Sequence, residues 1–151
     1  PCPPIPISNK MSKPVARQND LVVTSCIHQV QGMPAAQPAP PVVAPVPHPF
    51  NANFTQNLST KVKIGGQFVA LKGSKGLAQA HPPLPPPGTA PMGYVNPPNN
   101  QAEIVTASTS VKIEGKEVAR IGDSVKTCSE SPPPHGVVIP GGVPANVFIG
   151  D

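Results

Sequence analysis

An octet of residues recurs in this chain and limits the folds that the chain can adopt. KPVARQND at residues 13–20 and KEVARIGD at residues 116–123 share Lys, Val, Ala, Arg and Asp, which is five of eight positions. A third copy, QFVALKGS at residues 67–74, keeps only the Val and the Ala. The valines of the three copies lie 54 and 49 residues apart, so three units of about 50 residues account for the whole length.

The spacing of the octet predicts the domain organisation. We expect an N-terminal tail at residues 1–10, ahead of Met11, followed by a single domain at residues 11–151. The three units of that domain are expected at about residues 11–66, 67–115 and 116–151.

A second phrase predicts where the strands lie. STKVKIGG (59–66), STSVKIEG (108–115) and ANVFIGD (145–151) each contain Val-x-Ile with a Gly one or two residues later. Apolar residues that alternate with polar ones are typical of a half-buried strand, and the Gly-containing turn favours a tight hairpin into the following Val-Ala segment. We therefore predict hairpins within residues 59–74 and 108–125, and a last strand at 145–151 without a return strand of its own.

The prolines exclude helices from much of the chain. Proline runs in residues 33–49, 82–98 and 132–144 would break any helix, and these stretches are interpreted as long loops that emerge at one end of the molecule. The predicted fold is all-β: a small three-sided, β-prism-like cone of hairpins with pseudo-threefold repeats and long Pro-rich loops. Val and Ile would fill its narrow centre, where aromatic residues have no room, which agrees with an aromatic content of only 3%.

Charge and composition exclude several classes of protein. The net charge of +4 comes from scattered basic residues, and aromatic residues for base stacking are scarce, so we expect no nucleic-acid partner. No apolar stretch is long enough for a transmembrane helix, and residues 1–10 lack the features of a signal peptide. Three cysteines in such a chain argue against a disulfide framework and favour metal binding or inert thiols.

The histidines and cysteines are the candidate chemistry of the chain. His28, His48, His81 and His135 all fall in the predicted loops, together with Cys26 and Cys128. His28 follows Asp20 by eight residues, His81 follows Ser74 by seven, and Cys128 follows Asp123 by five. If the units surround one axis, these side chains converge at one end. Three His and one Cys would satisfy the four ligands of a closed structural zinc site, with His48 or His135 as the fourth.

Catalysis has little support in the sequence. Asp20 and Asp123 recur at equivalent turns and are interpreted as capping residues that accept backbone N–H bonds. GSKG at residues 73–76 lacks the P-loop pattern. We expect no enzymatic activity.

Taken together, these motifs resemble the PAAR-repeat proteins. The motif that names the family appears as Pro14-Val15-Ala16-Arg17 and again as Glu117-Val118-Ala119-Arg120, and HGVVIPGG and NVFIG complete the resemblance over residues 11–151. The resemblance implies a cone of β-hairpins. Its base would cap the trimeric, VgrG-like spike of a type VI secretion system or a related phage-tail-like contractile injection particle.

The resemblance also implies a ligand set. Family members hold a metal, usually zinc, at the point of the cone with three His and one Cys. Carried over by position, the ligands are His28, His48, His81 and Cys128, with His48 preferred to His135. Cys2 and Cys26 are then bystanders.

The predicted function is therefore a structural tip that pierces a target envelope, with its apex crosslinked by one zinc ion. It would be assembled in the bacterial cytoplasm, delivered outward on firing, and in transient contact with the target membrane. The middle unit departs from the pattern at Leu71 and Ser74, and its long loop is too short and polar for a toxin domain, so we expect a bare tip. A free-standing metal-binding adaptor that attaches cargo or effector to the spike is the alternative, and a zinc hydrolase is a third interpretation.

Overall fold

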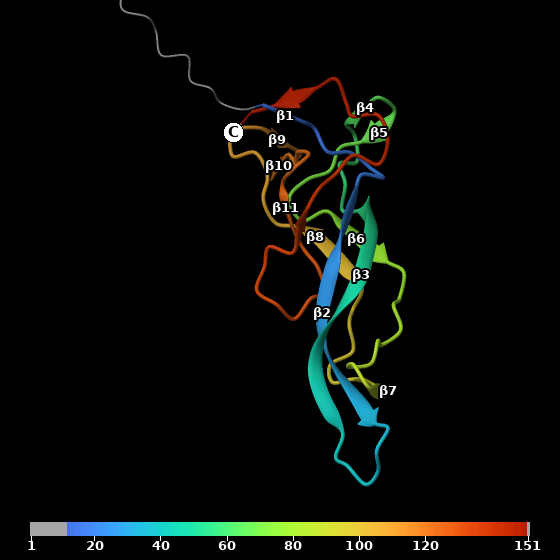
Figure 1. Ribbon diagram of the computed structural model, residues 1–151. Helices are drawn as coiled ribbons and strands as arrows, with labels where there is room; N and C mark the ends of the chain where they lie inside the picture. Colours follow the sequence, from blue (N-terminus) through green and yellow to red (C-terminus); the bar gives the residue numbers. More distant parts are fainter. Residues whose placement is uncertain (1–11, 151) are drawn as a thin grey trace, which may run out of the picture.

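The computed structural model describes residues 12–150, so the predicted tail at residues 1–10 lies outside the described part of the chain. The described residues form strands connected by turns and irregular segments, with no helix among them, which confirms the all-β class. Accordingly, nothing in residues 12–150 qualifies as a helix long and apolar enough to cross a membrane. The molecule is elongated: short paired strands gather at one end, and one long hairpin runs to the other (Figure 1).

Two short hairpins at the first end are the predicted ones. β4 (Lys63–Ile64) pairs with β5 (Gln67–Phe68), and β9 (Lys112–Ile113) pairs with β10 (Lys116–Glu117). The connecting residues have positive φ: 61° and 80° at Gly65 and Gly66, 54° and 79° at Glu114 and Gly115. A two-residue loop with positive φ at both positions is the type I′ turn, whose twist matches that of the strands. The hairpins predicted within residues 59–74 and 108–125 are confirmed.

The third pair joins the two ends of the chain. β13 (Phe148–Ile149) lies within the predicted last strand and pairs antiparallel with β1 (Lys13–Pro14). Ile149 is opposite Lys13 as Ile113 is opposite Lys116, so the N-terminal strand takes the place of the return strand that the last unit lacks. The described chain ends therefore meet where the other two units have their I′ turns.

A closed cycle of hydrogen bonds joins the three copies of the octet. The Ala16 amide donates to the Ala119 carbonyl at 2.9 Å, Ala119 donates to Ala70 at 3.0 Å, and Ala70 donates to Ala16 at 2.9 Å. Single β-bridges follow the same cycle: Arg17 with Val69, Leu71 with Val118, and Arg120 with Val15. The equivalence of the three units that the octet predicts is thus present in their backbone pairing.

The residue that ends each octet caps the turn behind it. Asp20 and Asp123 accept the backbone N–H of Arg17 and Arg120 at 2.8 and 2.7 Å, and the hydroxyl of Ser74 accepts that of Leu71 at 2.8 Å. The interpretation of Asp20 and Asp123 as turn-capping residues is confirmed. Ser74 caps the equivalent turn of the middle unit with an uncharged hydroxyl.

Below this cycle, each unit contributes two strands to one sheet. The pairs are β2 (Leu21–Pro34) with β3 (Val42–Gln56), β6 (Lys75–Ala78) with β8 (Gln101–Ile104), and β11 (Ser124–Lys126) with β12 (Gly136–Val137). The order is β12-β11-β8-β6-β3-β2, with β7 (Thr89–Tyr94) on the outer part of β2. A β-bridge between Leu21, the first residue of β2, and Ile139, just after β12, connects the last unit back to the first. The sheet therefore encloses a core.

The predicted loops at residues 33–49, 82–98 and 132–144 are partly wrong, because each contains strand. β3 includes Pro45, Pro47 and Pro49, which are spaced two residues apart. Alternate residues of a strand direct their N–H groups to the same side, so these three prolines lack donors only on the side facing away from β2. That side is an open edge here, since β6 pairs with β3 only from Ala52 onward. The prolines exclude a helix but not an edge strand.

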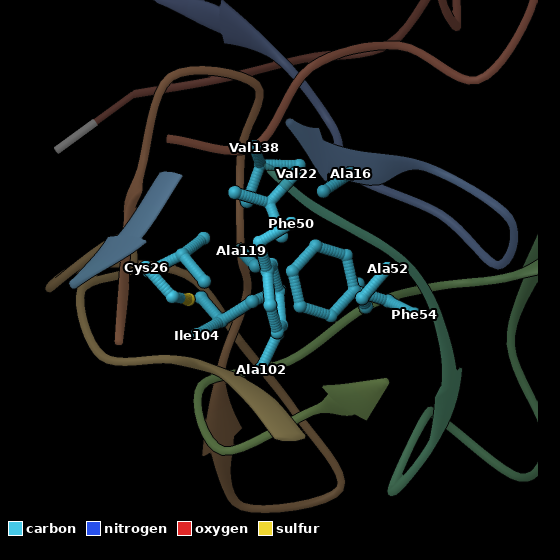
Figure 2. Packing of buried hydrophobic residues seen from close by; sticks show 12 residues of the cluster. Ala16, Val22, Cys26, Phe50, Ala52, Phe54, Ala102, Ile104, Ala119 and Val138 are labelled. Carbon is cyan, nitrogen blue, oxygen red and sulfur yellow. The ribbon is translucent and has the colours of Figure 1, made fainter. Parts of the chain in front are cut away.

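Two clusters of buried side chains stabilise the fold. The cluster at the short-strand end is aliphatic and includes Val15, Val69, Leu71 and Val118. The cluster inside the sheet contains Phe50 and Phe54, which are 2% and 0% exposed, so the expectation that aromatic residues have no room in the centre is wrong. Figure 2 shows the two rings among small side chains such as Ala102 and Ala119. Small residues from the other two units leave the volume that the two rings fill.

Candidate metal centre

The structure brings three of the four histidines together. His28 lies in β2 and His48 in β3, so the expectation that both lie in loops is wrong, whereas His81 follows β6 outside any strand. The ring centroids of His28 and His48 are 5.5 Å apart, and the ring of His81 lies 5.3 Å from each of them. His28 and His48 are 1% and 0% exposed. The side chains form a compact triangle inside the arm, by which we mean the long β2–β3 hairpin together with the segments packed on it.

Two sulfur atoms lie next to His28, one corner of this triangle. The Cys128 Sγ is 3.7 Å from the Nε2 of His28 and 3.7 Å from the Sγ of Cys26. Donor atoms of Cys26, His28 and Cys128 all lie within 4.8 Å of one another, so these residues could hold a metal ion. Cys26 was interpreted from the sequence as a bystander, yet it is buried within the same cluster.

His81 and His48 differ in the state of their ring nitrogens. Both nitrogens of His81 are buried without a hydrogen-bond partner among the described residues. The Nδ1 of His48 donates to the Val46 carbonyl at 2.9 Å, and its Nε2 accepts the Leu84 amide at 2.9 Å. Buried nitrogens without a partner are costly, and the pair on His81 is therefore the observation that best fits a ligand-binding role. His48 would have to release the Leu84 amide in order to bind a metal through Nε2.

His135 has a different environment. Its Nδ1 accepts the backbone N–H of Thr127 at 2.8 Å, and its Nε2 donates to the Ser131 carbonyl at 2.7 Å. Both ring nitrogens are thereby used to fold the segment between Thr127 and β12. Of the two histidines that the sequence left open, His48 is the one placed against His28 and His81.

The protonation states suit metal binding at neutral pH. The side-chain interaction with Cys26 lowers the pKa of the Cys128 thiol to about 7, whereas the pKa of Cys26 is raised by the same interaction and by burial. Burial lowers the pKa of His28 and of His81; after burial, His81 and His48 lower that of His28, and His48 lowers that of His81. Thiolates and neutral imidazoles are the forms that ligate zinc, so binding would release the proton that Cys128 still carries in part of the molecules near pH 7.

Glu130 and Tyr94 lie around these donors, and neither was predicted from the sequence as part of a site. The Glu130 carboxylate lies 3.9 Å from the Nδ1 of His28 and accepts the Gln29 amide. The ring of Tyr94 packs edge-on against His28 at 5.4 Å, and its hydroxyl donates to the His81 carbonyl at 2.8 Å. Tyr94 is the only tyrosine of the chain and stands in a Pro-rich stretch, which is the one signal that could have singled it out.

The cluster does not lie at the far end of the molecule, where the apex was expected. Cys26 is opposite His48 in the β2–β3 ladder, and the ladder continues to the pair of Gly32 with Val42 before the chain turns. Six more residues of β2 at about 3.3 Å each extend the hairpin by roughly 20 Å beyond the cluster. The reason is the strand character of the Pro-rich segment, which prolongs the arm past its donors.

Comparison with protein-family models and with curated proteins found no match to this chain.

Proposed function

We propose that this chain is a PAAR-repeat spike tip, which caps the trimeric, VgrG-like spike of a contractile injection particle and is driven through a target envelope. The observation that carries the proposal is the hydrogen-bond cycle through Ala16, Ala70 and Ala119. A single chain with three equivalent sides can dock on a threefold spike without a symmetry mismatch. A three-sided cone with its base at this cycle is the shape that the proposal requires.

The surface at the short-strand end supports contact with a spike. Val143 is 87% exposed, Phe148 is 59% exposed and Val147 is 39% exposed. Phe148 lies in β13 and Val147 directly precedes it, at the end of the molecule where the pairs β4–β5 and β9–β10 also lie (Figure 1). Val143 lies in the segment before β13 and lines one surface hollow with Val147 and Ile64. Large apolar side chains that gather on a surface mark an interaction site. The spike would cover them.

The second part of the proposal is one structural zinc ion held by His28, His48, His81 and Cys128. These residues come from all three units, so a bound ion would crosslink the units within the arm. Zinc supplies a tetrahedral set of bonds without redox chemistry, which suits a mechanical role. The orphaned nitrogens of His81 and the short contact of Cys128 with His28 fit this group. Four protein ligands would leave no open position for a hydrolytic water, so we propose no enzymatic activity.

Mechanically, the proposal assigns each part a role. The Ala cycle and the aliphatic cluster hold the base, and the enclosed sheet transmits the axial load into the arm. The ion replaces a hydrophobic core where the arm is too narrow for one. The tip would be assembled in the bacterial cytoplasm and carried outward on the spike.

Co-purification with a trimeric spike protein tests the docking. The wild type should form a complex of one tip chain per spike trimer, and Phe148→Glu should lose it by placing a charge against the apolar contact. Met92→Glu is the matched control, because Met92 is 50% exposed but lies in β7 on the arm. Equal binding by all three proteins, or binding to cargo without the spike, would favour the adaptor alternative.

A further inference from the structure

The buried cysteine next to the proposed zinc ligand suggests chemistry that a structural zinc site does not use. We propose that Cys26 and Cys128 are a redox-sensitive pair that closes to an intramolecular disulfide, and that closure expels the metal. The part that concerns metal release rests on the proposed zinc site, whereas disulfide formation does not. The reaction partner would be a low-molecular-weight disulfide.

The geometry places the two sulfur atoms in contact. They are 3.7 Å apart and must approach to about 2.05 Å, a change that side-chain rotation can supply when the backbones are already adjacent. The adjacency is fixed by the segment around Cys128. The Ile27 amide donates to the Ser129 hydroxyl at 2.9 Å, and the Glu130 amide donates to the Ile27 carbonyl at 2.9 Å. These bonds hold the segment against β2 beside Cys26.

The two cysteines differ in access, which assigns their roles. Cys26 is 0% exposed, and its Sγ lies 3.1 Å from the Thr127 hydroxyl. Cys128 is half-buried and lines a shallow surface groove of about 280 Å³ together with His28 and Lys126. A reagent in solution therefore reaches Cys128 first. Cys26 is the resolving thiol.

The reaction balances in two exchanges. The Cys128 thiolate attacks one sulfur of oxidised glutathione, breaks its S–S bond and releases one glutathione thiolate. The Cys26 thiol gives its proton to water, attacks the Cys128 sulfur of the mixed disulfide and releases the second glutathione. The two protein thiols are oxidised and one glutathione disulfide is reduced.

The consequence for the metal follows from ligand chemistry. A disulfide sulfur is no thiolate, so Cys128 ceases to be a ligand and three histidines remain. Such disulfides form where the surroundings are oxidising and are rare in the cytosol. The pair would keep its zinc where the particle is assembled and lose it in an oxidising space.

Peptide mapping of the full chain tests disulfide formation. Trypsin separates the cysteines into residues 1–10, 18–61 and 127–151. After incubation of metal-free protein with oxidised glutathione and alkylation of free thiols, we expect peptide 18–61 linked to peptide 127–151. Cys26→Ser should instead accumulate glutathione on peptide 127–151. The inference is overturned if the wild type also stops at that mixed disulfide, or if peptide 1–10 is the partner of peptide 127–151.

Zinc-loaded protein tests the metal release. A colorimetric chelator should record the loss of about one zinc per chain as the linked peptides appear, and dithiothreitol followed by zinc should restore the loaded form. Cross-linked protein that keeps its zinc overturns the release while the disulfide stands. A chain that never takes up zinc overturns the proposed metal site, and the peptide map still decides the cysteine chemistry.

Discussion

The Arg120–Asp123 pair offers a sharp test of whether the three units are energetically equivalent. Both side chains are buried, at 5% and 3% exposure. Asp123 accepts the Arg120 amide at 2.7 Å and the Arg120 guanidinium at 3.0 and 3.2 Å. In the middle unit, Leu71 and Ser74 occupy the same two positions without any charge. The middle unit is thus a natural example of the same turn without charged side chains.

The perturbation is a pair of variants. Asp123→Ser keeps a hydroxyl that can cap the Arg120 amide, as Ser74 caps Leu71, but removes the buried carboxylate that neutralises Arg120. Removing one partner of a buried ion pair leaves the other charge buried without compensation, which lowers the free energy of unfolding by about 3–5 kcal/mol. The double variant, Arg120→Leu with Asp123→Ser, reproduces the middle unit and should lie within about 1 kcal/mol of the wild type, because a packed apolar replacement of a buried pair is often neutral.

Reversible denaturant unfolding measures these free energies, and thermal unfolding is the parallel assay. For a chain of this size each 1 kcal/mol shifts the Tm by about 2–4 °C, so Asp123→Ser should melt roughly 6–20 °C lower than the wild type. The double variant should recover most of that loss. The same measurements on metal-free protein separate the effect from zinc binding.

Two results would refute this reasoning. A loss below about 1 kcal/mol for Asp123→Ser would mean that Arg120 is stabilised without its carboxylate. A double variant as unstable as the single one would mean that the turn of the third unit cannot accept the packing of the second. Either result would mean that units with equivalent sequence positions do not have equivalent energetics.

Three further predictions concern the sheet, the base and the metal. Gly76→Ala should destabilise the fold by several kcal/mol, roughly as overpacking does, because the added Cβ would lie 2.1 Å from the Asn53 carbonyl oxygen, whereas Gly142→Ala, with open space around it, should be neutral in the same melt. Glu114 has a lowered pKa, chiefly through hydrogen bonds from Thr60, so its contribution is present above the ordinary pKa of Glu and is lost as the pH falls through the lowered value. The Tm difference between wild type and Glu114→Gln should therefore be constant at neutral pH and vanish in acid; a difference that grows in acid contradicts this. Removal of zinc by a chelator should lower the Tm by an amount that rises with the concentration of added zinc in the reference sample, and an unchanged Tm would contradict a structural ion.

Much of the short-strand end, where β4–β5 and β9–β10 lie, was predictable from sequence alone. The octet and the Val-x-Ile phrase each carry local information: a glycine-containing turn, alternation and a capping Asp. Local rules fix local structure, so β4–β5, β9–β10 and the caps at Asp20 and Asp123 were predicted. The pairing of β13 with β1 needed one more step, since only closure of the repeat brings the two ends of the chain together.

The arm was harder to predict because its rules are not local. Proline at alternate positions is incompatible with a helix but compatible with an edge strand, and which edge is open depends on where β6 stops pairing with β3. The burial of Phe50 and Phe54 is not local either. Both residues face the inner side of β3, and the space for their rings comes from Ala102 and Ala119 in other units. A sequence read one segment at a time contains neither fact.

The proximity of Cys26 to Cys128 was within reach of the sequence once the caps are used as an origin. β2 and β11 begin at the residue after Asp20 and Asp123, and both lead away from the Ala cycle. Cys26 lies six residues beyond its cap and Cys128 five, so at about 3.3 Å per residue they descend to depths that differ by only one residue. Residues at equal depth are neighbours where their segments also lie side by side, as the segment after β11 lies against β2 through Ile27, Ser129 and Glu130. The count predicts a sulfur pair where family resemblance predicted a bystander.

The position of Cys26 beside Cys128 raises the question of whether Cys26 is itself a metal ligand, which cobalt substitution can test. The lowered pKa of Cys128 and the raised pKa of Cys26 predict a thiolate at Cys128 beside a protonated Cys26, which is then not itself a ligand. In cobalt-substituted protein, Cys26→Ser should therefore keep the full thiolate-to-cobalt absorption, while Cys128→Ser abolishes it. His48→Gln should keep the absorption but weaken cobalt binding by at least about tenfold, since even residues behind the ligands cost 10–100-fold. If Cys26→Ser halves the absorption and His48→Gln binds cobalt normally, the site is a two-sulfur site, and Cys26 takes the place assigned to His48.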